Sequence, residues 1–299
     1  MGTITKSGFI AIVGRPNVGK STLINRLVGQ KVAIVSQRPQ TTRNRIIAIL
    51  NRDDTQMIFL DTPGFHRPKN RLGEYMEDIV HESLADVDCI LLTVEPKTAP
   101  TEDEKRLIEK MKGRDIPVIL VINKTDTVPK PAILMAMAAY APLMEFKAIM
   151  PISARTGEGI AELECEIGDY MQPGPEFYPQ DMVTDQPERA VVAEIIREKM
   201  LRLLSDEIPH GVAVAIESFD ESRDDLIKIG ACIYCEKDSH KGIIIGKNGK
   251  MLKKIGTYAR EELERMFECK VFLDVFVKVD AGWRNKAGSL REFGYTREE

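Results

Sequence analysis

The stretch that most constrains this chain is a glycine-bounded loop at residues 14–21. Its sequence, Gly-Arg-Pro-Asn-Val-Gly-Lys-Ser, matches G-x-x-x-x-G-K-[ST], the pattern of loops that hold nucleotide phosphates. Residues 9–13 before it are apolar and predict a buried strand, and residues 22–28 after it predict a helix closed by Gly29. Strand, glycine loop and helix in this order are the context that separates a working phosphate site from a chance match.

The residue types in this loop suit a site for anions. Gly14 and Gly19 let the backbone turn sharply and approach a ligand without a Cβ in the way. Successive N–H groups and the N-terminus of the following helix attract phosphate oxygens. Lys20 would reach the β- and γ-phosphates, and the Ser21 hydroxyl would coordinate Mg²⁺. We predict ten phosphate-binding residues: Gly14, Arg15, Pro16, Asn17, Val18, Gly19, Lys20, Ser21, Thr22 and Gly64.

A second motif follows the predicted strand at residues 56–60. It reads Asp61-Thr-Pro-Gly64, the D-x-x-G pattern. In phosphoryl-transfer sites an aspartate at a strand end holds Mg²⁺ through water, and the glycine N–H can bond the γ-phosphate. The pattern is weak alone and becomes specific when it follows a phosphate loop. It predicts Asp61 as a second residue of the magnesium site.

Two further motifs predict that the base is guanine. Asn123-Lys124-Thr-Asp126 follows an apolar strand and matches N-K-x-D, the base-recognition motif of GTPases. An aspartate carboxylate can accept from both N1–H and N2–H of guanine, and adenine offers no such donor pair. Residues 153–155 resemble the S-A-K loop that closes over this base. The predicted guanine-binding residues are Asn123, Lys124, Asp126, Ser153, Ala154 and Arg155.

The order of predicted elements gives two domains. Strands alternate with helices over residues 8–171, which predicts an α/β fold with a doubly wound sheet and its site at the carboxyl ends of the strands. Three prolines between residues 173 and 179 favour an extended spacer. We therefore predict a nucleotide-binding domain at 1–172, a linker at 173–185, and a second domain with a C-terminal tail at 186–299, in which 282–295 has no readable role.

The second domain carries a glycine loop of another kind. Residues 242–256 resemble the I-I-G-x-x-G signature of KH domains, in which a helix–GxxG–helix unit clamps the backbone of about four nucleotides. The flanking elements predict the order α-β-β-α-α-β of a type II KH fold. The window 237–260 holds seven basic residues against one acidic residue. The predicted RNA-binding residues are Gly246, Lys247, Asn248, Gly249, Lys250, Lys253 and Lys254.

Composition excludes several other classes. An apolar fraction of 43% with 29% charged residues is that of a globular protein, and the net charge of −4 argues against a wholly basic nucleic-acid binder. No apolar run is long enough to span a bilayer, and the first residues show no signal peptide. The five cysteines include one C-x-x-C pair, Cys232 and Cys235, on a predicted strand, so we expect reduced cytoplasmic thiols rather than a metal site.

Together these motifs resemble the Era family of bacterial ribosome-assembly GTPases, over nearly the whole chain. The resemblance implies a GTP-hydrolysing protein with a slow intrinsic rate and a Mg²⁺ cofactor. It also implies binding to the 3′ end of small-subunit ribosomal RNA, with GTP or GDP controlling residence on the pre-30S particle. The expected location is the cytoplasm. Peripheral contact with the inner face of the cell membrane is implied by the family alone.

The same resemblance assigns two switch segments. The loop with Thr41 and Thr42 is switch I, with Thr42 the first choice for the magnesium and γ-phosphate ligand and Thr41 the second. Switch II begins at Gly64, and Phe65 stands where Ras-type GTPases have a catalytic glutamine. Asn17 matches an asparagine that binds K⁺ in related GTPases, so K⁺ activation is a hypothesis here. An alternative is an RNA-binding assembly factor that senses nucleotide and for which hydrolysis is incidental.

Overall fold

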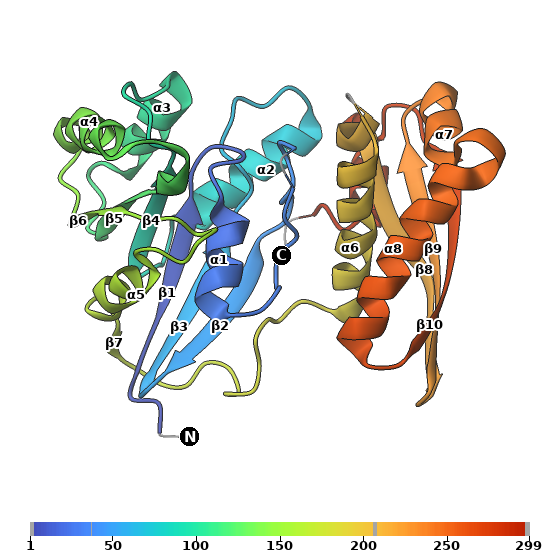
Figure 1. Cartoon of the computed structure of the whole chain (residues 1–299), viewed down its shortest axis with the longest axis horizontal. Helices are drawn as coiled ribbons and strands as arrows, with labels where there is room; N and C mark the ends of the chain where they lie inside the picture. The colour runs from blue at the N-terminus through green and yellow to red at the C-terminus, as the bar shows by residue number, and fades with distance from the viewer. Residues whose placement is uncertain (1–2, 37, 206–207, 297–299) are drawn as a thin grey trace. The chain divides into compact units, whose positions relative to one another are not determined.

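The computed structural model describes residues 3–36, 38–205 and 208–296 of the chain. They fall into two compact units (Figure 1). The first comprises Met1–Pro68 with Met76–Asp185, and the second comprises Lys69–Tyr75 with Gln186–Glu299. This division places the break after Asp185, at the far end of the predicted linker.

The first unit is built on a mainly parallel sheet with the strand order β2-β3-β1-β4-β5-β6. Among the described strands of this sheet, β2 runs antiparallel to β3 and the short β7 runs antiparallel to β1, and the other pairs are parallel. The central strands are buried on both faces, which explains their continuous apolar runs. The strands are β1 (Lys6–Val13), β2 (Ile46–Arg52), β3 (Thr55–Asp61), β4 (Cys89–Val94), β5 (Val118–Ile122), β6 (Ala148–Pro151) and β7 (Gln172–Pro173).

Helices cover both faces of this sheet, so the predicted doubly wound α/β fold is confirmed. One apolar core joins the sheet to α1 (Lys20–Val28) and α5 (Ile160–Gly168). The other core joins it to α2 (Arg71–Glu82), α3 (Glu102–Met111) and α4 (Lys130–Tyr140). The glycine loop ends β1, D-x-x-G ends β3, and N-K-x-D ends β5, so all three motifs lie at the carboxyl edge of the sheet.

The prolines of the predicted linker do not produce a free spacer. The Gln56 side chain on β3 donates to the carbonyl oxygen of Tyr178 (2.7 Å) and accepts from the Phe177 and Tyr178 amides. Farther along, Ile49 N–H on β2 donates to the Val183 oxygen (2.9 Å). The segment is extended, as predicted, and these bonds bind it to β3 and to the edge strand β2 of the first sheet.

The second unit has the predicted order of helix, two strands, two helices and strand. Its sheet has the order β10-β9-β8, with β9 antiparallel to β8 and parallel to β10. One apolar core lies between this sheet and α6, α7 and α8. The elements are α6 (Glu188–Leu203), β8 (Val212–Arg223), β9 (Leu226–Cys235), α7 (Asp238–Ile245), α8 (Lys250–Phe267), β10 (Lys270–Val279) and α9 (Ala287–Glu292).

The C-terminal tail has a structural role that the sequence does not reveal. Trp283 is fully buried, and its indole N–H donates to the carbonyl oxygen of Gly211 (3.0 Å). Its ring lies 5.4 Å from that of Phe293, which in turn lies 4.5 Å from Tyr234 on β9. Tyr234 alternates with the core-facing residues of β9, so the tail covers part of the sheet face opposite the helices.

The five cysteines lie in both units, and none is part of a disulfide. Cys235 joins the apolar core, whereas Cys232 alternates with the core residues of β9. Among residues 3–36, 38–205 and 208–296 there is no group of three or more His, Cys, Asp or Glu side chains arranged to hold a metal ion. Within these same ranges no helix is long and apolar enough to cross a membrane.

Candidate functional site

The loop between β1 and α1 is held by the core of the unit itself. Gly14 and Gly19 have positive φ angles of 152° and 100°. A Cβ at position 14 would lie 2.2 Å from the Thr93 oxygen, and one at position 19 would lie 2.2 Å from the Asn123 amide nitrogen. Glycine is therefore required at both positions by the packing of the protein as well as by its backbone conformation.

Lys20 is a buried ammonium group inside this loop. Its Nζ donates to the carbonyl oxygens of Gly14 and Arg15, each at 3.2 Å, and only 6% of the residue is exposed. Burial lowers the pKa of Lys20 to about 8, and the carboxylate of Asp61 partly opposes this shift. The charge is thus costly in the protein alone and is well placed to be stabilised by phosphate oxygens.

Three predicted metal-binding residues meet at one point. The Ser21 hydroxyl donates to Asp61 Oδ2 (2.7 Å) and lies 3.0 Å from the Thr42 hydroxyl, which lies 3.3 Å from the same carboxylate oxygen. Asp61 is fully buried, and burial raises its pKa. Its other oxygen, Oδ1, is buried without a hydrogen-bond partner among the described residues. An orphaned carboxylate oxygen beside two hydroxyls fits Mg²⁺, a hard cation that prefers oxygen ligands.

The structure also separates the two switch I threonines. The Thr42 hydroxyl joins the cluster with Ser21 and Asp61. The Thr41 hydroxyl donates to the carbonyl oxygen of Arg38 (2.7 Å). The geometry therefore favours Thr42 over Thr41 as the metal-site residue.

Asn123 ties the base-recognition loops to the phosphate loop. Its amide nitrogen donates to the Val18 oxygen (2.9 Å), and its Oδ1 accepts from the amides of Lys124 (2.8 Å) and Ala154 (3.0 Å). One buried side chain thus connects three loops that come from β1, β5 and β6. This arrangement predicts that Asn123 shapes the site and does not act on the base alone.

Asp126 presents its carboxylate next to these loops. Ser153 donates to one oxygen (2.6 Å), and Arg155 forms an ion pair with the other. The hydrogen bond from Ser153 contributes most to lowering the pKa of Asp126, followed by that from Arg155. An ionised aspartate is the form that can accept two hydrogen bonds from guanine.

These loops are supported by two residues that the sequence motifs do not include. Arg26 on α1 donates from Nε to the Ala154 oxygen (3.0 Å) and from Nη2 to the Arg155 oxygen. Glu95 after β4 accepts from Lys124 Nζ (2.6 Å), whose ammonium also donates to the Asn17 oxygen. No motif marks either position, because each contact joins segments far apart in the sequence.

Phe65 is turned away from the phosphate loop. Its N–H donates to the Gly14 oxygen (2.9 Å), and a Cβ at Gly64 would lie 2.6 Å from the backbone of Pro16. The Phe65 ring, only 1% exposed, packs into the core with the Lys110 ammonium 5.0 Å from its centre. The backbone of Phe65 thus contacts the phosphate loop, whereas its side chain points into the core and away from a ligand in that loop.

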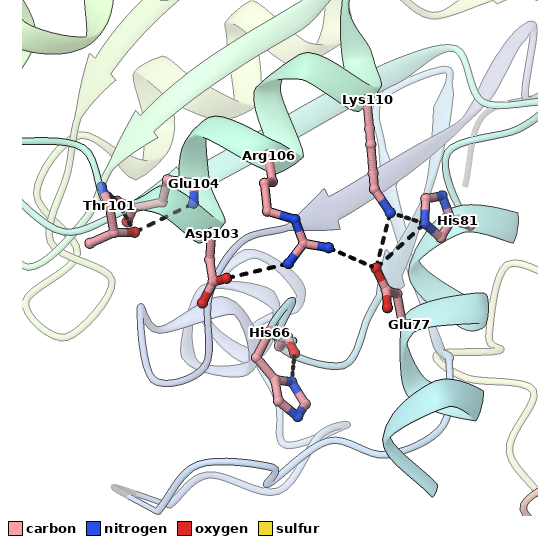
Figure 2. Close-up of polar contacts among 9 residues, drawn as sticks. His66, Glu77, His81, Thr101, Asp103, Glu104, Arg106 and Lys110 are labelled. Atoms are coloured by element: carbon pink, nitrogen blue, oxygen red, sulfur yellow. Dashed lines mark hydrogen bonds and ion pairs between the residues drawn. The ribbon is translucent and has the colours of Figure 1, made fainter. Parts of the chain in front are cut away.

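The residue after it, His66, is a polar group that sequence reasoning missed. Its Nδ1 lies 2.8 Å from the Gly64 oxygen, and its Nε2 lies 3.1 Å from the side-chain nitrogen of Gln40 (Figure 2 shows the first contact). A carbonyl only accepts, so Nδ1 carries the proton and Nε2 accepts from Gln40. His66 therefore joins the two switch loops. Its position two residues after the glycine of D-x-x-G is the sequence signal that could have identified His66 as a switch residue.

Ion pairs hold α2 against α3 beside Phe65. Glu77 accepts from Lys110 (3.0 Å) and lies 3.7 Å from Arg106, and Lys110 also contacts His81 (Figure 2). Burial, followed by the Lys110 charge, lowers the pKa of His81. A capping box begins α3, in which Glu104 accepts from the Thr101 amide (2.7 Å). These contacts keep the helix that follows switch II in place.

The GxxG loop of the second unit lies between α7 and α8. Gly246 and Gly249 have φ angles of 70° and 73°, and Asn248 between them is also left-handed at 55°. Beside the loop runs a hollow of about 400 Å³ between α8 and β10, lined by Gly249, Leu252, Lys253, Gly256, Thr257, Arg260, Leu273 and Val275. An apolar floor with basic rims suits bases and phosphates.

Most of the predicted basic residues are available to a ligand. In the part of the chain that the structure describes, Lys247, Lys250, Lys253 and Arg260 form no salt bridge. Lys253 lines the hollow. In the same part of the chain Lys254 likewise forms no salt bridge and is exposed, and its ammonium lies over the ring of Tyr258, 5.7 Å from its centre.

The first sheet and its loops define a P-loop GTPase, and the second unit defines a KH domain. Family models agree: residues 9–124 match a 50S ribosome-binding GTPase, and residues 207–284 match a KH domain. GTPase Era of Ruminiclostridium cellulolyticum is 51% identical over 290 residues, covering 97% of both chains. That of Geotalea uraniireducens is 50% identical, covering 97% of this chain and 98% of its own. The chain belongs to the GTPase Era family, and it is a GTP-hydrolysing enzyme.

Solved structures agree over both units. A crystal structure of Era in complex with MgGDPNP and nucleotides 1506–1542 of 16S ribosomal RNA has a TM-score of 0.94 and 38% identity, covering 98% of this chain and all of the other. A variant of Aquifex aeolicus Era bound to GDP·AlF4⁻ has a TM-score of 0.93 and 39% identity over the same shares. The predicted α/β GTPase domain followed by an α+β KH domain is confirmed.

Proposed function

We propose that this protein couples GTP binding and hydrolysis to RNA binding during assembly of the small ribosomal subunit. Its ligand would be the 3′ end of small-subunit ribosomal RNA on the pre-30S particle. The relatives named GTPase Era and the Era structure with a 16S RNA fragment support this proposal. The observation that carries it is local. One unit joins a buried ammonium, an orphaned carboxylate oxygen and a base-recognition aspartate at one sheet edge, and the other unit presents a basic GxxG groove.

The residues of the first unit have distinct tasks in this reaction. Lys20 neutralises the β- and γ-phosphates, and Asp126 accepts from guanine, supported by Ser153. Ser21, Thr42 and Asp61 would hold Mg²⁺. When bound, this ion neutralises the charge that develops on the phosphate oxygens. Gly64 packs against the backbone of Pro16 in the phosphate loop, so a γ-phosphate bound in that loop can change the position of switch II.

Hydrolysis without an accelerating partner is expected to be slow. Phe65 cannot orient a water molecule, because its side chain is apolar and buried in the core. We propose that K⁺ bound next to Asn17 supplies positive charge that stabilises the negative charge developing on the phosphate oxygens. Asn17 is exposed in the phosphate loop with φ at 66°. Hydrolysis measured in matched K⁺ and Na⁺ buffers should be several-fold faster in K⁺, and an Asn17→Ala variant should lose that difference. Equal rates in both buffers would remove K⁺ from the mechanism.

The main proposal is tested by separating nucleotide binding from RNA binding. Lys20→Ala should abolish GTP hydrolysis and fail to support small-subunit maturation in cells. Full rescue by this variant would instead favour the alternative, in which hydrolysis is incidental to an RNA-binding assembly factor. Crosslinking of bound cellular RNA with a non-hydrolysable GTP analogue and with GDP then shows whether the nucleotide changes RNA occupancy. Identical maps would contradict the coupling.

We propose a cytoplasmic location for this protein. The pre-30S particle is assembled there, and free cysteines stay reduced there. Peripheral contact with the inner face of the membrane rests on the family alone. Binding to vesicles containing anionic lipid, measured by co-sedimentation, tests that contact directly.

A further inference from the structure

The ring of Phe65 lies beneath two cations of α3. Its centre is 5.0 Å from the Lys110 ammonium and 5.6 Å from the guanidinium carbon of Arg106. A cation over an aromatic face is attracted by the ring electrons, and the attraction grows where water is excluded. The Lys110 side chain is 27% exposed and that of Arg106 is 45% exposed, so Lys110 makes the better shielded contact with the ring.

One carboxylate on α2 holds both cations. Glu77 Oε1 lies 3.0 Å from Lys110 Nζ and 3.7 Å from Arg106 Nη2. Figure 2 shows both side chains extending from α3 toward Glu77. Arg106 also pairs with Asp103 of its own helix (3.8 Å), whereas the other contacts of Lys110 include His81 on α2. We call Glu77, Arg106 and Lys110 the α2–α3 clamp.

The backbone of Phe65 connects this clamp to the phosphate loop. Its N–H donates to the Gly14 oxygen (2.9 Å). The preceding residue, Gly64, packs so closely on Pro16 that an added Cβ would lie 2.6 Å from its backbone. Because the ring and the N–H belong to one residue, a ring that is held in place restricts the movement of Gly64. Switch II is therefore anchored on the phosphate loop by its backbone and under the clamp by its ring.

We propose that Glu77 and Lys110 are positioning residues for GTP. Glu77 holds Lys110 over the Phe65 ring, and the fixed ring keeps Gly64 where its N–H meets the γ-phosphate. GDP has no γ-phosphate, so the clamp strengthens the binding of GTP and not that of GDP. The inference rests on the proposed function, in which switch II contacts the γ-phosphate, and it names groups outside the nucleotide site that control this contact.

The test compares the affinities of the full-length protein for GDP and for the non-hydrolysable analogue GDPNP, both with Mg²⁺, by fluorescence titration. Lys110→Met removes the charge and keeps a flexible side chain. It should weaken GDPNP binding about fivefold, the size of one partly shielded cation–π contact, and leave GDP binding unchanged. Lys110→Arg keeps a cation over the ring and should retain the wild-type affinities. No change with Lys110→Met, or an equal loss for GDP, would overturn the proposal.

Lys112→Met is the matched control. Lys112 lies at the C-cap of the same helix and pairs with Glu109 of α3 (2.6 Å). The substitution removes the same charge from the same end of the helix, and the ratio of GDPNP to GDP affinity should stay at the wild-type value. If it shifts this ratio as much as Lys110→Met does, the charge of α3 and not the contact with Phe65 is responsible, and the proposal fails.

A double-mutant cycle isolates the contact with the ring. In a Phe65→Leu background no aromatic ring remains, so Lys110→Met should change the affinity ratio no further. An equal change in both backgrounds would show that Lys110 acts without the ring. Glu77→Gln should shift the ratio in the same direction by a smaller factor, because the amide oxygen still accepts from Lys110. An unchanged ratio in Glu77→Gln would remove Glu77 from the proposal.

Gly64→Ala distinguishes failure of this inference from failure of the proposed function. The added Cβ collides with Pro16, so switch II has to move away from the phosphate loop. This variant should bind GDPNP more weakly relative to GDP. If its affinity ratio equals that of the wild type, the proposed contact of switch II with the γ-phosphate is itself wrong. If Gly64→Ala lowers the ratio and Lys110→Met does not, only the role of the clamp is wrong.

Discussion

The two glycine loops of this protein resemble each other in sequence and differ in what surrounds them. A Cβ at Gly19 in the phosphate loop would lie 2.2 Å from Asn123, whereas a Cβ at Gly249 in the KH loop would have no atom within 4 Å. The lysine of the first loop, Lys20, is 6% exposed, and the lysine after Gly249, Lys250, is exposed. The phosphate loop is part of a core, and the KH loop is part of a surface.

Glycine is needed at Gly19 and at Gly249 for different reasons. At Gly19 the protein itself fills the space, so a side chain there harms folding and binding together. At Gly249 the protein has room for a side chain, and only the left-handed backbone conformation disfavours one. Any further need for glycine at this position therefore comes from the ligand. Three substitutions and one change of pH test these different roles of the two loops.

The largest effect is expected from Gly19→Ala. The added Cβ collides with the Asn123 side chain that joins three loops, and φ is 100°. We expect a loss of about 3 kcal/mol in the free energy of unfolding and no measurable GDP binding by fluorescence titration. Gly29→Ala is the control, because φ there is 79° with no atom within 4 Å. If both variants behave alike, steric contact is not what fixes Gly19.

Phe65→Gln, which supplies the side chain that Ras-type enzymes use, should not accelerate hydrolysis. The side chain at this position lies in the apolar core, so an amide there is buried without a partner. We expect a destabilisation of about 2 kcal/mol and an unchanged or lower turnover rate. Phe65→Leu keeps the position apolar and should cost less. A faster Phe65→Gln enzyme would show that the side chain can leave the core and reach the phosphates.

Gly249→Asp should reduce RNA affinity at least about tenfold, since like charges placed together at an interface cost several kcal/mol. The strain of a left-handed residue should lower the free energy of unfolding by only about 1 kcal/mol. Gly282→Asp in the same unit is the matched control, with φ at 67° and no atom within 4 Å. It should show the same loss of stability with full RNA affinity. Equal RNA loss in both variants would assign the effect to folding.

The smallest effect is the pH dependence of GDP binding. The pKa of Lys20 in the protein alone is about 8, and bound phosphates favour the charged form. GDP binding at pH 8 should therefore take up about half a proton, and affinity should be about twofold lower than at pH 7. Calorimetry in two buffers of different ionisation enthalpy measures this uptake. Zero uptake, or release of a proton, would place the lysine pKa elsewhere.

The fold and the outline of the site could be predicted from the sequence because their signals are local. Gly14–Ser21, Asp61 and Asp126 lie in short motifs at strand ends, and the parallel sheet brings those ends together. The choice of Thr42 over Thr41 depends on the three-dimensional structure, since adjacent residues in a loop carry no periodicity to separate them.

What the sequence did not predict depends on contacts between distant segments. Arg26 reaches a loop 128 residues away, and Gln56 binds the proline-rich segment about as far along the chain. Helix α4 has an apolar sequence with no distinct polar face, so no amphipathic period marks it.

The packing of Trp283 has a practical consequence. It is the only tryptophan of the chain, and it is enclosed among Gly211, Phe293 and Tyr295 in the second unit. Intrinsic tryptophan emission therefore reports the integrity of the KH unit and is silent about the GTPase unit. A denaturation experiment that follows this emission beside a fluorescent guanine nucleotide gives a separate unfolding curve for each unit of the unlabelled protein.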